Sequence, residues 1–426
     1  MTTPDKTIAV INASGRQAAS FIRVATAVGY HVRAQLRNLE GVVATEVATN
    51  PNVTILKGEL YTKERPAETV QVDVTRNGPI SGIGVNHDLI SELFRGAQLA
   101  FINTTFYGDE LSIGKALADA AKAAGIQHYI YSSMPDHAHY NKDWPSLPLW
   151  ASKHKVEDYV KEIGLPATFV YTGIYNNNFT SLAYPLFCTD LQPDGSWIWQ
   201  APFHPDVKLP WLDAEHDVGP AILQIIKDGV RKWGGGKRIA LAYEMLSPRE
   251  ACEVFTRGVG RPVRYVRGPI EIKVKIPEGY RCQLEALETL FTLGQDDPSK
   301  QPPYFGDVEL ERNCPRVALE LWEGPRGLEE YAREVFPLEE QANGLTWMLE
   351  EDEGGGGGNR HSNQNGNGIA GQQVHLQHQH HLHHHHHLEG GEVVVPANEP
   401  PDSDGEDEDE GLVMRGLKRD DEEWLA

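Results

Sequence analysis

The sequence predicts an α/β protein built on a doubly wound, parallel Rossmann-type sheet, and three observations support this class. Between residues 5 and 180, short apolar runs alternate with amphipathic helical patterns. The apolar runs are rich in β-branched residues, which is typical of strands that are buried on both faces. A glycine-containing turn joins the first run to the first helical pattern, at the place where dinucleotide-binding folds hold phosphate groups.

Six segments have the composition of strands, and helical patterns separate them. The first strand is predicted in KTIAVIN, and the helix after it, RQAASFIRVATAVG, has one apolar stripe and ends at Gly29. Further strands are predicted in YHVRAQL, NVTILKG, LAFINTT, QHYIYSS and ATFVYTG, with helices over 109–125 and 152–164. This order predicts a parallel sheet with helices on both faces.

Composition divides the chain into a dinucleotide-binding domain and three other parts. Residues 61–86 are rich in Gly, Pro, Thr and Asn and are predicted to form a surface loop inserted into the domain at 5–180. Residues 181–350 lose the alternation and contain several tryptophans and prolines, which favours a smaller α+β lobe. Residues 351–426 are Gly/His-rich and acidic, and we expect a disordered tail.

The charge of the chain argues against direct contact with DNA. The tail contains 17 acidic and 4 basic residues, and the preceding 350 residues contain 44 acidic and 35 basic ones. Both parts are therefore negative, which disfavours binding to nucleic acid phosphates and favours a basic protein partner.

Metal, disulfide and membrane features are not predicted. The four cysteines are far apart and form no C-x-x-C pair, and the histidine run near the end of the chain is interpreted as a polar repeat. No stretch approaches the ~20 apolar residues of a membrane span. The N-terminus leads directly into the first strand without a secretory leader pattern, so we expect a soluble intracellular protein.

The turn NASGRQA departs from the glycine template of dinucleotide sites. The template places glycine at positions 12, 15 and 18, where this chain has Asn12, Gly15 and Ala18. Gly15 lets the backbone approach a phosphate, asparagine tolerates a left-handed backbone, and alanine is small enough where the helix meets the strand. Ser14, Arg16 and Gln17 add hydrogen-bond donors. An ordinary strand-to-helix turn is the alternative interpretation.

The end of the second strand indicates which dinucleotide fits. NAD sites usually present an acidic residue there for the ribose hydroxyls, whereas HVRAQLRN ends in Arg37 and Asn38. Arg37 suits a 2′-phosphate, so the sequence predicts that NADP is accepted. A solvated loop arginine is the alternative.

Later strand ends carry polar residues but lack the tyrosine of a reductase. Asn103, Thr104 and Thr105 follow the fourth strand, at the edge where ligands bind in open α/β sheets. Short-chain dehydrogenases use a Tyr-x-x-x-Lys pair, in which lysine lowers the tyrosine pKa for proton transfer. Here Leu149 stands four residues before Lys153. The sequence therefore predicts dinucleotide binding without carbonyl reduction.

The segment YTGIYNNNF follows the sixth strand. Its Asn176, Asn177 and Asn178, which follow Tyr175, offer amide donors and acceptors that suit the carboxamide end of a dinucleotide. A capped turn is the alternative interpretation.

Several segments together resemble the NmrA-like group of atypical short-chain dehydrogenases, and within it the nitrogen metabolite repression regulators of filamentous fungi. They are NASGRQAAS, AFINTT, QHYIYSSMPDH, IYNNNFTSL, PWLDAEHDVGPA and EEYAREVFPLEEQANGLTWML, spread over most of residues 5–350. The resemblance implies a Rossmann domain with a smaller lobe that binds NAD or NADP, the oxidised forms being favoured, with little or no dehydrogenase activity. The insert at 61–86 is longer than the family's connection, and the tail lies beyond its last shared segment.

The same resemblance implies site residues and a partner. Cofactor contacts fall on Asn12, Ala13, Ser14, Gly15, Arg16, Gln17, Arg37, Asn38, Asn103, Thr104, Thr105, Lys153, Tyr175, Asn176, Asn177 and Asn178. The partner is a GATA-type zinc-finger activator, which implies a location in the nucleus, the cytoplasm or both. Candidate docking clusters are Asp213, Glu215 and Asp217, and Glu329 and Glu330. The alternative function is an NADPH-dependent reductase of the isoflavone-reductase type, which also has the lysine without the tyrosine.

Overall fold

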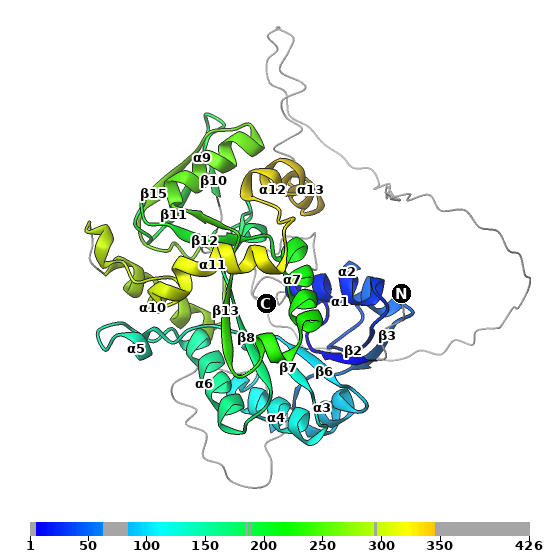
Figure 1. Ribbon diagram of the computed structural model, residues 1–426. Helices are drawn as coiled ribbons and strands as arrows, with labels where there is room; N and C mark the ends of the chain where they lie inside the picture. Colours follow the sequence, from blue (N-terminus) through cyan, green and yellow to red (C-terminus); the bar gives the residue numbers. More distant parts are fainter. Residues whose placement is uncertain (1–5, 63–83, 184–185, 188, 294–295, 346–426) are drawn as a thin grey trace, which may run out of the picture. The chain divides into compact units, whose positions relative to one another are not determined.

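The computed structural model describes residues 6–62, 84–183, 186–187, 189–293 and 296–345. Its main layer is a seven-stranded sheet in the order β13-β8-β7-β6-β1-β2-β3, and every neighbouring pair is parallel. The strands are β1 (Thr7–Val10), β2 (His31–Leu36), β3 (Val53–Lys57), β6 (Leu99–Ile102), β7 (His128–Ser133), β8 (Ala167–Thr172) and β13 (Lys237–Leu241). The strand order reverses at β1, so the predicted doubly wound Rossmann class is confirmed (Figure 1).

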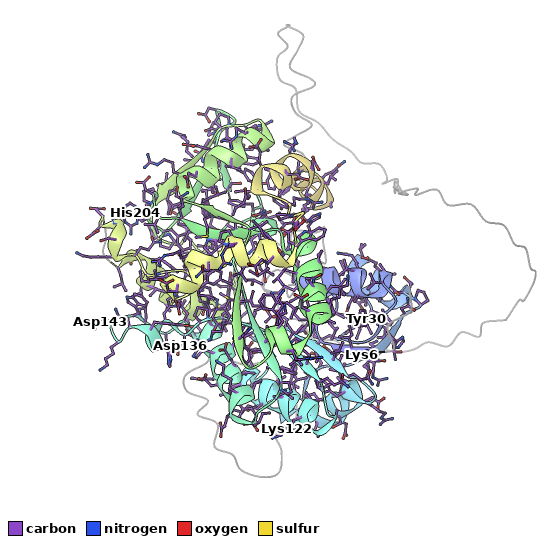
Figure 2. The ribbon with its side chains drawn as sticks, viewed as in Figure 1. Lys6, Tyr30, Lys122, Asp136, Asp143 and His204 are labelled. Carbon is purple, nitrogen blue, oxygen red and sulfur yellow. The ribbon has the colours of Figure 1, made fainter. Side chains whose placement is uncertain are left out.

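Because the strands are parallel, their carboxyl ends meet at one edge of the sheet. Lys6 and Tyr30 directly precede β1 and β2, and they lie close together at the amino edge (Figure 2). Asn12, Arg37 and Asn103 come just after β1, β2 and β6 and therefore lie at the opposite, carboxyl edge. Open α/β sheets bind their ligands at this edge, beside the strand where the order reverses.

The sheet separates two hydrophobic cores. Ile8 and Val10 of β1 belong to one core and Ala9 and Ile11 to the other, because successive side chains of a strand point to opposite faces. All four residues are fully buried. This explains why the first strand is apolar throughout rather than alternating with polar residues.

Helices cover both faces of the sheet (Figure 1). One face carries α1 (Arg16–Ala27), α2 (Val42–Thr49) and α7 (Ala214–Asp228). The helices α8 (Val230–Trp233) and α11 (Val308–Leu321) pack against the same core. The other face carries α3 (His87–Phe94), α4 (Glu110–Ala123) and α6 (Pro148–Glu162). The short helix α5 (His137–Tyr140) follows β7. The predicted helices over 109–125 and 152–164 correspond to α4 and α6.

Much of the chain beyond the sheet forms a smaller α+β assembly. It contains two three-stranded sheets. The first consists of β10 (Thr189–Leu191), β11 (Trp197–Ala201) and β15 (Val263–Arg267), in that order. The second consists of β14 (Glu244–Leu246), β12 (Leu209–Leu212) and β9 (Ile174–Tyr175), in that order. Its helices are α9 (Pro248–Val259), α10 (Glu278–Thr292), α12 (Leu328–Glu334) and α13 (Phe336–Ala342), with 3₁₀ turns at Asn176–Asn178 and Pro298–Lys300. Trp197, Trp199 and Trp211 are fully buried in its core.

Several details depart from the sequence-based expectations. The strand β13 and the helices α2, α10 and α11 were not expected. Four elements from beyond residue 180, namely β13, α7, α8 and α11, belong to the sheet layer, and the division into lobes at that residue stays a prediction. The two ends of the expected 61–86 loop pair as an antiparallel ribbon of β4 (Tyr61–Thr62) and β5 (Gly84–Val85). The expected tail at 351–426 lies outside the described residues.

Helices α1 and α7 approach each other closely at Gly219. A Cβ atom at this position would lie 2.3 Å from the backbone oxygen of Ser20, and the Gly219 N–H donates to Ser20 Oγ over 2.9 Å. No other residue type fits without separating the two helices. The contact therefore fixes α1, whose N-terminus faces the carboxyl edge of the sheet.

We expect Gly219→Ala to lower the free energy of unfolding by about 1–3 kcal/mol, because overpacking forces the backbone to shift. Gly279→Ala in α10 is the matched control, since a Cβ there meets nothing within 4 Å. The control is expected to be neutral or stabilising by up to about 1 kcal/mol. Urea unfolding of both variants tests this, and equal midpoints would contradict the close approach.

Candidate dinucleotide-binding site

The chain leaves β1 through a left-handed residue, Asn12, whose φ is +50°. Among the described residues other than glycine, it alone has a positive φ, so the expectation that asparagine replaces the first glycine is confirmed. Its Nδ2 donates to the carbonyl oxygen of Asn103 over 2.7 Å, and its backbone N–H donates to Gln35 Oε1 over 3.0 Å. The turn is thereby tied to the ends of β6 and β2.

Helix α1 begins directly after this turn, with Gly15 as its N-cap residue. In the described structure no side chain caps the helix, and its first turn has no acidic residue. The backbone N–H groups of Ser14, Arg16 and Gln17 have no protein acceptor there. Free N–H groups and the positive end of the helix dipole suit an anionic group such as a pyrophosphate.

A cavity of about 180 Å³ lies beside the turn. The predicted site residues in its lining are Gln17, Asn103, Thr104, Thr105, Lys153, Tyr175 and Asn178. The Oε1 atom of Gln17 is buried and has no hydrogen-bond partner within the described residues. Such an atom needs a partner, and a polar ligand in the cavity would supply one.

Sequence reasoning missed the apolar part of this cavity. Trp150, Phe203, Tyr280, Leu284 and Tyr304 belong to its lining. Most of them come from segments beyond residue 200, which carry no motif and meet the sheet only in the folded chain. The unexpected helix α10 supplies two of them.

A smaller hollow of about 20 Å³ shares Thr104 and Thr105 with the cavity. Asn12, Gln35, Arg37 and Tyr107 also line it, and the guanidinium carbon of Arg37 lies 5.2 Å from the centre of the Tyr107 ring. It adjoins the end of β2, where the adenosine ribose of a dinucleotide lies. Asn38 lines neither space, and its Oδ1 accepts the N–H of Glu40 over 3.1 Å.

A buried polar network borders the cavity. Lys153 Nζ lies 2.9 Å from Glu110 Oε1 and also donates to the carbonyl oxygen of Thr104. The Thr104 hydroxyl donates to the same Glu110 oxygen over 2.7 Å and lies 2.8 Å from the Tyr131 hydroxyl. Burial raises the pKa of Tyr131, which keeps that hydroxyl protonated. Sequence reasoning missed Glu110, which looks like an ordinary first-turn acid.

Helix α6 presents Leu149 and Lys153 to the same cavity, one turn apart. The Leu149 N–H donates to Gln283 Oε1 over 2.9 Å. One turn further, the buried Glu157 accepts from Arg238, Lys161, Ser133 and Tyr171 and fixes the helix to the sheet.

Of the contacts predicted in the segment YTGIYNNNF, Tyr175 and Asn178 line the cavity, whereas Asn176 and Asn177 are buried in the protein interior. The Tyr175 hydroxyl accepts from Gln17 Nε2 and lies 3.2 Å from Thr172 Oγ1, and burial raises its pKa. Asn178 Oδ1 accepts from Arg16 at 3.5 Å.

The other two asparagines lie outside the linings of both spaces. Asn177 Oδ1 accepts the N–H of Ala214 over 2.8 Å, and Asn176 Nδ2 donates to the Arg326 carbonyl oxygen over 3.5 Å. The hydrogen bonds of these two residues agree with the alternative interpretation from the sequence, a capped turn.

Two of the three residues in the first acidic cluster considered for partner docking are buried, and the third, Glu215, is exposed. Asp213 and Asp217 are fully buried: Asp213 caps α7 and binds the Arg326 guanidinium, and Asp217 binds His216 and the Arg326 N–H. Glu215 accepts from Arg16 Nε over 3.1 Å. The docking prediction is therefore wrong for Asp213 and Asp217, because carboxylates that cap and pair inside the protein cannot reach a partner.

Within the described residues, no helix combines the length and the apolar character that crossing a bilayer requires. No group of three potential metal ligands comes together in the same part of the chain. The histidine run lies outside the described residues.

The fold and the site together define a protein of the Rossmann dinucleotide-binding class. More narrowly, the chain belongs to the NmrA-like family, whose model matches residues 4–332. The family resemblance predicted from the sequence is confirmed.

Two curated relatives are similar over most of the chain. It is 79% identical to the nitrogen metabolite repression protein nmr of Neurospora crassa over 441 residues, which cover 100% of this chain and 88% of that protein. It is 52% identical to the nitrogen metabolite repression protein nmrA of Emericella nidulans over 383 residues, which cover 82% of this chain and 100% of that protein.

Solved structures of NmrA, a negative transcriptional regulator, match with a TM-score of 0.71. Complexes with NAD and with NADP each share 55% identity with this chain, and each match covers 81% of this chain and 99% of the solved one.

The turn at Asn12 generates a stability prediction. We expect Asn12→Val to lower the free energy of unfolding by about 1–3 kcal/mol, because a β-branched residue is strained at positive φ. Asn12→Gly is the matched variant and is expected to stay within about 1 kcal/mol of the unmodified protein, since glycine adopts this conformation freely. Thermal unfolding compares the two, and a valine variant as stable as the glycine variant would contradict the role of the turn.

Proposed function

We propose that this chain is a non-catalytic, NAD(P)-binding negative regulator of transcription in nitrogen metabolite repression. The observation that carries the proposal is its 79% identity to the Neurospora protein along its entire length, combined with a cavity at the carboxyl edge of the sheet. NmrA itself is described as a negative transcriptional regulator and has been solved with NAD and with NADP.

The residues at the edge of the sheet fit a dinucleotide. The free N–H groups of Ser14, Arg16 and Gln17 would hold the pyrophosphate, and Arg37 would face the adenosine ribose and its 2′-phosphate. Thr104, Thr105 and Tyr175 line the space for the nicotinamide half. The bound cofactor would supply a nicotinamide ring whose charge depends on its redox state.

The absence of dehydrogenase chemistry follows from the groups around that half. Leu149 has no proton to give. The Tyr175 hydroxyl is bound to Gln17 and has a raised pKa, so it does not ionise readily. The ammonium of Lys153 is held by Glu110 and Thr104 rather than by a tyrosine. In the described lining, no side chain therefore combines a mobile proton with an activating lysine.

Calorimetric titration of the full chain with NAD, NADP, NADH and NADPH tests the cofactor assignment. We expect the oxidised forms to bind more tightly than the reduced ones. Arg37→Ala is expected to weaken NADP by about tenfold and NAD by less than about threefold, because only NADP offers a phosphate for a charge-assisted hydrogen bond. An unmodified protein that rejects NADP would remove Arg37 from this role.

The competing function is an NADPH-dependent reductase of the isoflavone-reductase type. Its supporting observations are Lys153 and the apolar lining of the cavity. Steady oxidation of NADPH in the presence of carbonyl or quinone substrates would favour this function over the regulator.

We further propose that the partner is a GATA-type zinc-finger activator, held inactive by steric blockage in the nucleus or the cytoplasm. The net negative charge of the chain supports a basic partner. Of the candidate contacts from the sequence, Glu215, Glu329 and Glu330 are not buried, and Glu329 and Glu330 form the pair that lies together on one helix. Both belong to the first turn of α12, where Glu330 is exposed and Glu329 is partly exposed and paired with Arg257.

Charge reversal on α12 tests this docking surface. We expect Glu329→Lys/Glu330→Lys to weaken binding of a recombinant GATA-type zinc finger by about tenfold or more, since like charges oppose docking. Asp88→Lys/Glu162→Lys, at exposed carboxylates of α3 and α6, is the control and should leave the affinity within about threefold. Surface plasmon resonance at fixed salt measures both, and an equal effect of the two pairs would exclude α12.

A further inference from the structure

The large cavity contains one pair of opposite charges. Among the described residues that line it, Glu110 and Lys153 are the ionised side chains, and the others are uncharged. Glu110 is 5% exposed and Lys153 is 16% exposed, with 2.9 Å between Nζ and Oε1. Because both side chains are largely removed from water, their charges are weakly screened at the cavity wall.

The positive member of the pair is saturated by protein acceptors. An ammonium group has three N–H donors. Lys153 has three acceptors in Glu110 Oε1, the Thr104 carbonyl oxygen and Thr104 Oγ1. All three acceptors come from the end of β6 and the start of α4, so the lysine is held toward these elements.

Glu110, the negative member of the pair, has one carboxylate oxygen that accepts no hydrogen bond within the described residues. Glu110 Oε1 accepts from both Thr104 and Lys153, whereas Oε2 accepts no hydrogen bond within the described residues. Although Oε2 has no such partner, it is not a fully buried atom, and it therefore remains accessible. The carboxylate therefore presents a negative oxygen at the cavity while it neutralises the lysine.

We propose that Glu110 maintains the preference of this site for the oxidised dinucleotide by compensating the charge of Lys153. The inference rests on the proposed function, in which the nicotinamide half occupies the large cavity. An oxidised nicotinamide ring carries a positive charge and a reduced ring is neutral. A lysine without a counter-charge would repel the oxidised ring, whereas the pair of Lys153 with Glu110 removes this repulsion and adds an attractive oxygen.

The proposal makes a prediction about charge rather than shape. Replacing Glu110 by glutamine keeps the size of the side chain and leaves the positive charge of Lys153 uncompensated. Removing both charges returns the wall to neutrality. Preference for the oxidised form should therefore follow the net charge of the pair, not the identity of either residue.

The test is calorimetric titration of the full chain with NAD and with NADH, for the unmodified protein and four variants. They are Glu110→Gln, Lys153→Met, the double variant Glu110→Gln/Lys153→Met, and Asp88→Asn as the control. Asp88 is an exposed acid in the first turn of α3, so its loss removes the same charge outside the cavity.

We expect Glu110→Gln to lower the ratio of NAD affinity to NADH affinity by about tenfold, as an uncompensated charge near the ring would. The double variant should restore the ratio to within about threefold of the unmodified protein, and the control should not change it. Lys153→Met leaves a net negative charge at the cavity wall and should therefore raise the ratio. If Glu110→Gln fails to fold, this variant tests the proposal, because an unchanged or lower ratio in Lys153→Met would overturn it.

Other results would contradict either the proposal or the function on which it rests. An unchanged ratio in Glu110→Gln, or a double variant with the same low ratio as Glu110→Gln, overturns the role of Glu110 and leaves the cofactor assignment standing. Failure of the unmodified chain to bind either dinucleotide overturns the proposed function and, with it, this inference.

Discussion

The hydrogen bond from Asn12 Nδ2 to the carbonyl oxygen of Asn103 joins the turn after β1 to the end of β6. It holds a left-handed residue in place, so that α1 can begin with free N–H groups at the carboxyl edge of the sheet. The position of α1 then depends on Gly219, which lets α7 pack against it. Helix α7 is in turn capped by Asp213, which also binds Arg326. One line of contacts thus runs from the turn to the segment before α12.

Two groups of buried charges beside the sheet are compensated. Lys153 pairs with Glu110, and Glu157 with Arg238 and Lys161. Removing one partner of such a group is costly, because the other charge stays buried without compensation. The pairing with Glu110 therefore offsets the cost of holding Lys153 at the wall of the cavity.

The sequence predicted the parts of the molecule that obey local rules. Buried parallel strands are apolar throughout, and a glycine turn precedes a helix, so β1 and the residues from Asn12 to Gln17 could be assigned. The strand β13 could not, because its five residues follow a glycine-rich turn and find their partner, β8, far back in the chain. Asp213 and Asp217 looked like surface acids because sequence does not report burial. Their hydrogen bonds to α7 and Arg326 appear only in the folded chain.

In the candidate site, too, some residues could be predicted from the sequence and others could not. The polar residues at strand ends could be predicted, since parallel strands end at one edge. Glu110 and the apolar residues of α10 could not, because their roles depend on how α4 and the smaller assembly pack around the cavity. Asn176 and Asn177 resembled ligand contacts by composition, whereas their amides serve the turn and the start of α7.

The central claim is that a dinucleotide binds between the Asn12 turn and the large cavity. Hydrogen–deuterium exchange of the full chain, with and without NAD, tests it directly. The N–H groups of Ser14, Arg16 and Gln17 have no acceptor among the described residues and should therefore exchange rapidly in the free protein. The account predicts that NAD slows exchange at residues 14–17 and at 103–105. Unchanged exchange in both segments at saturating NAD would contradict it.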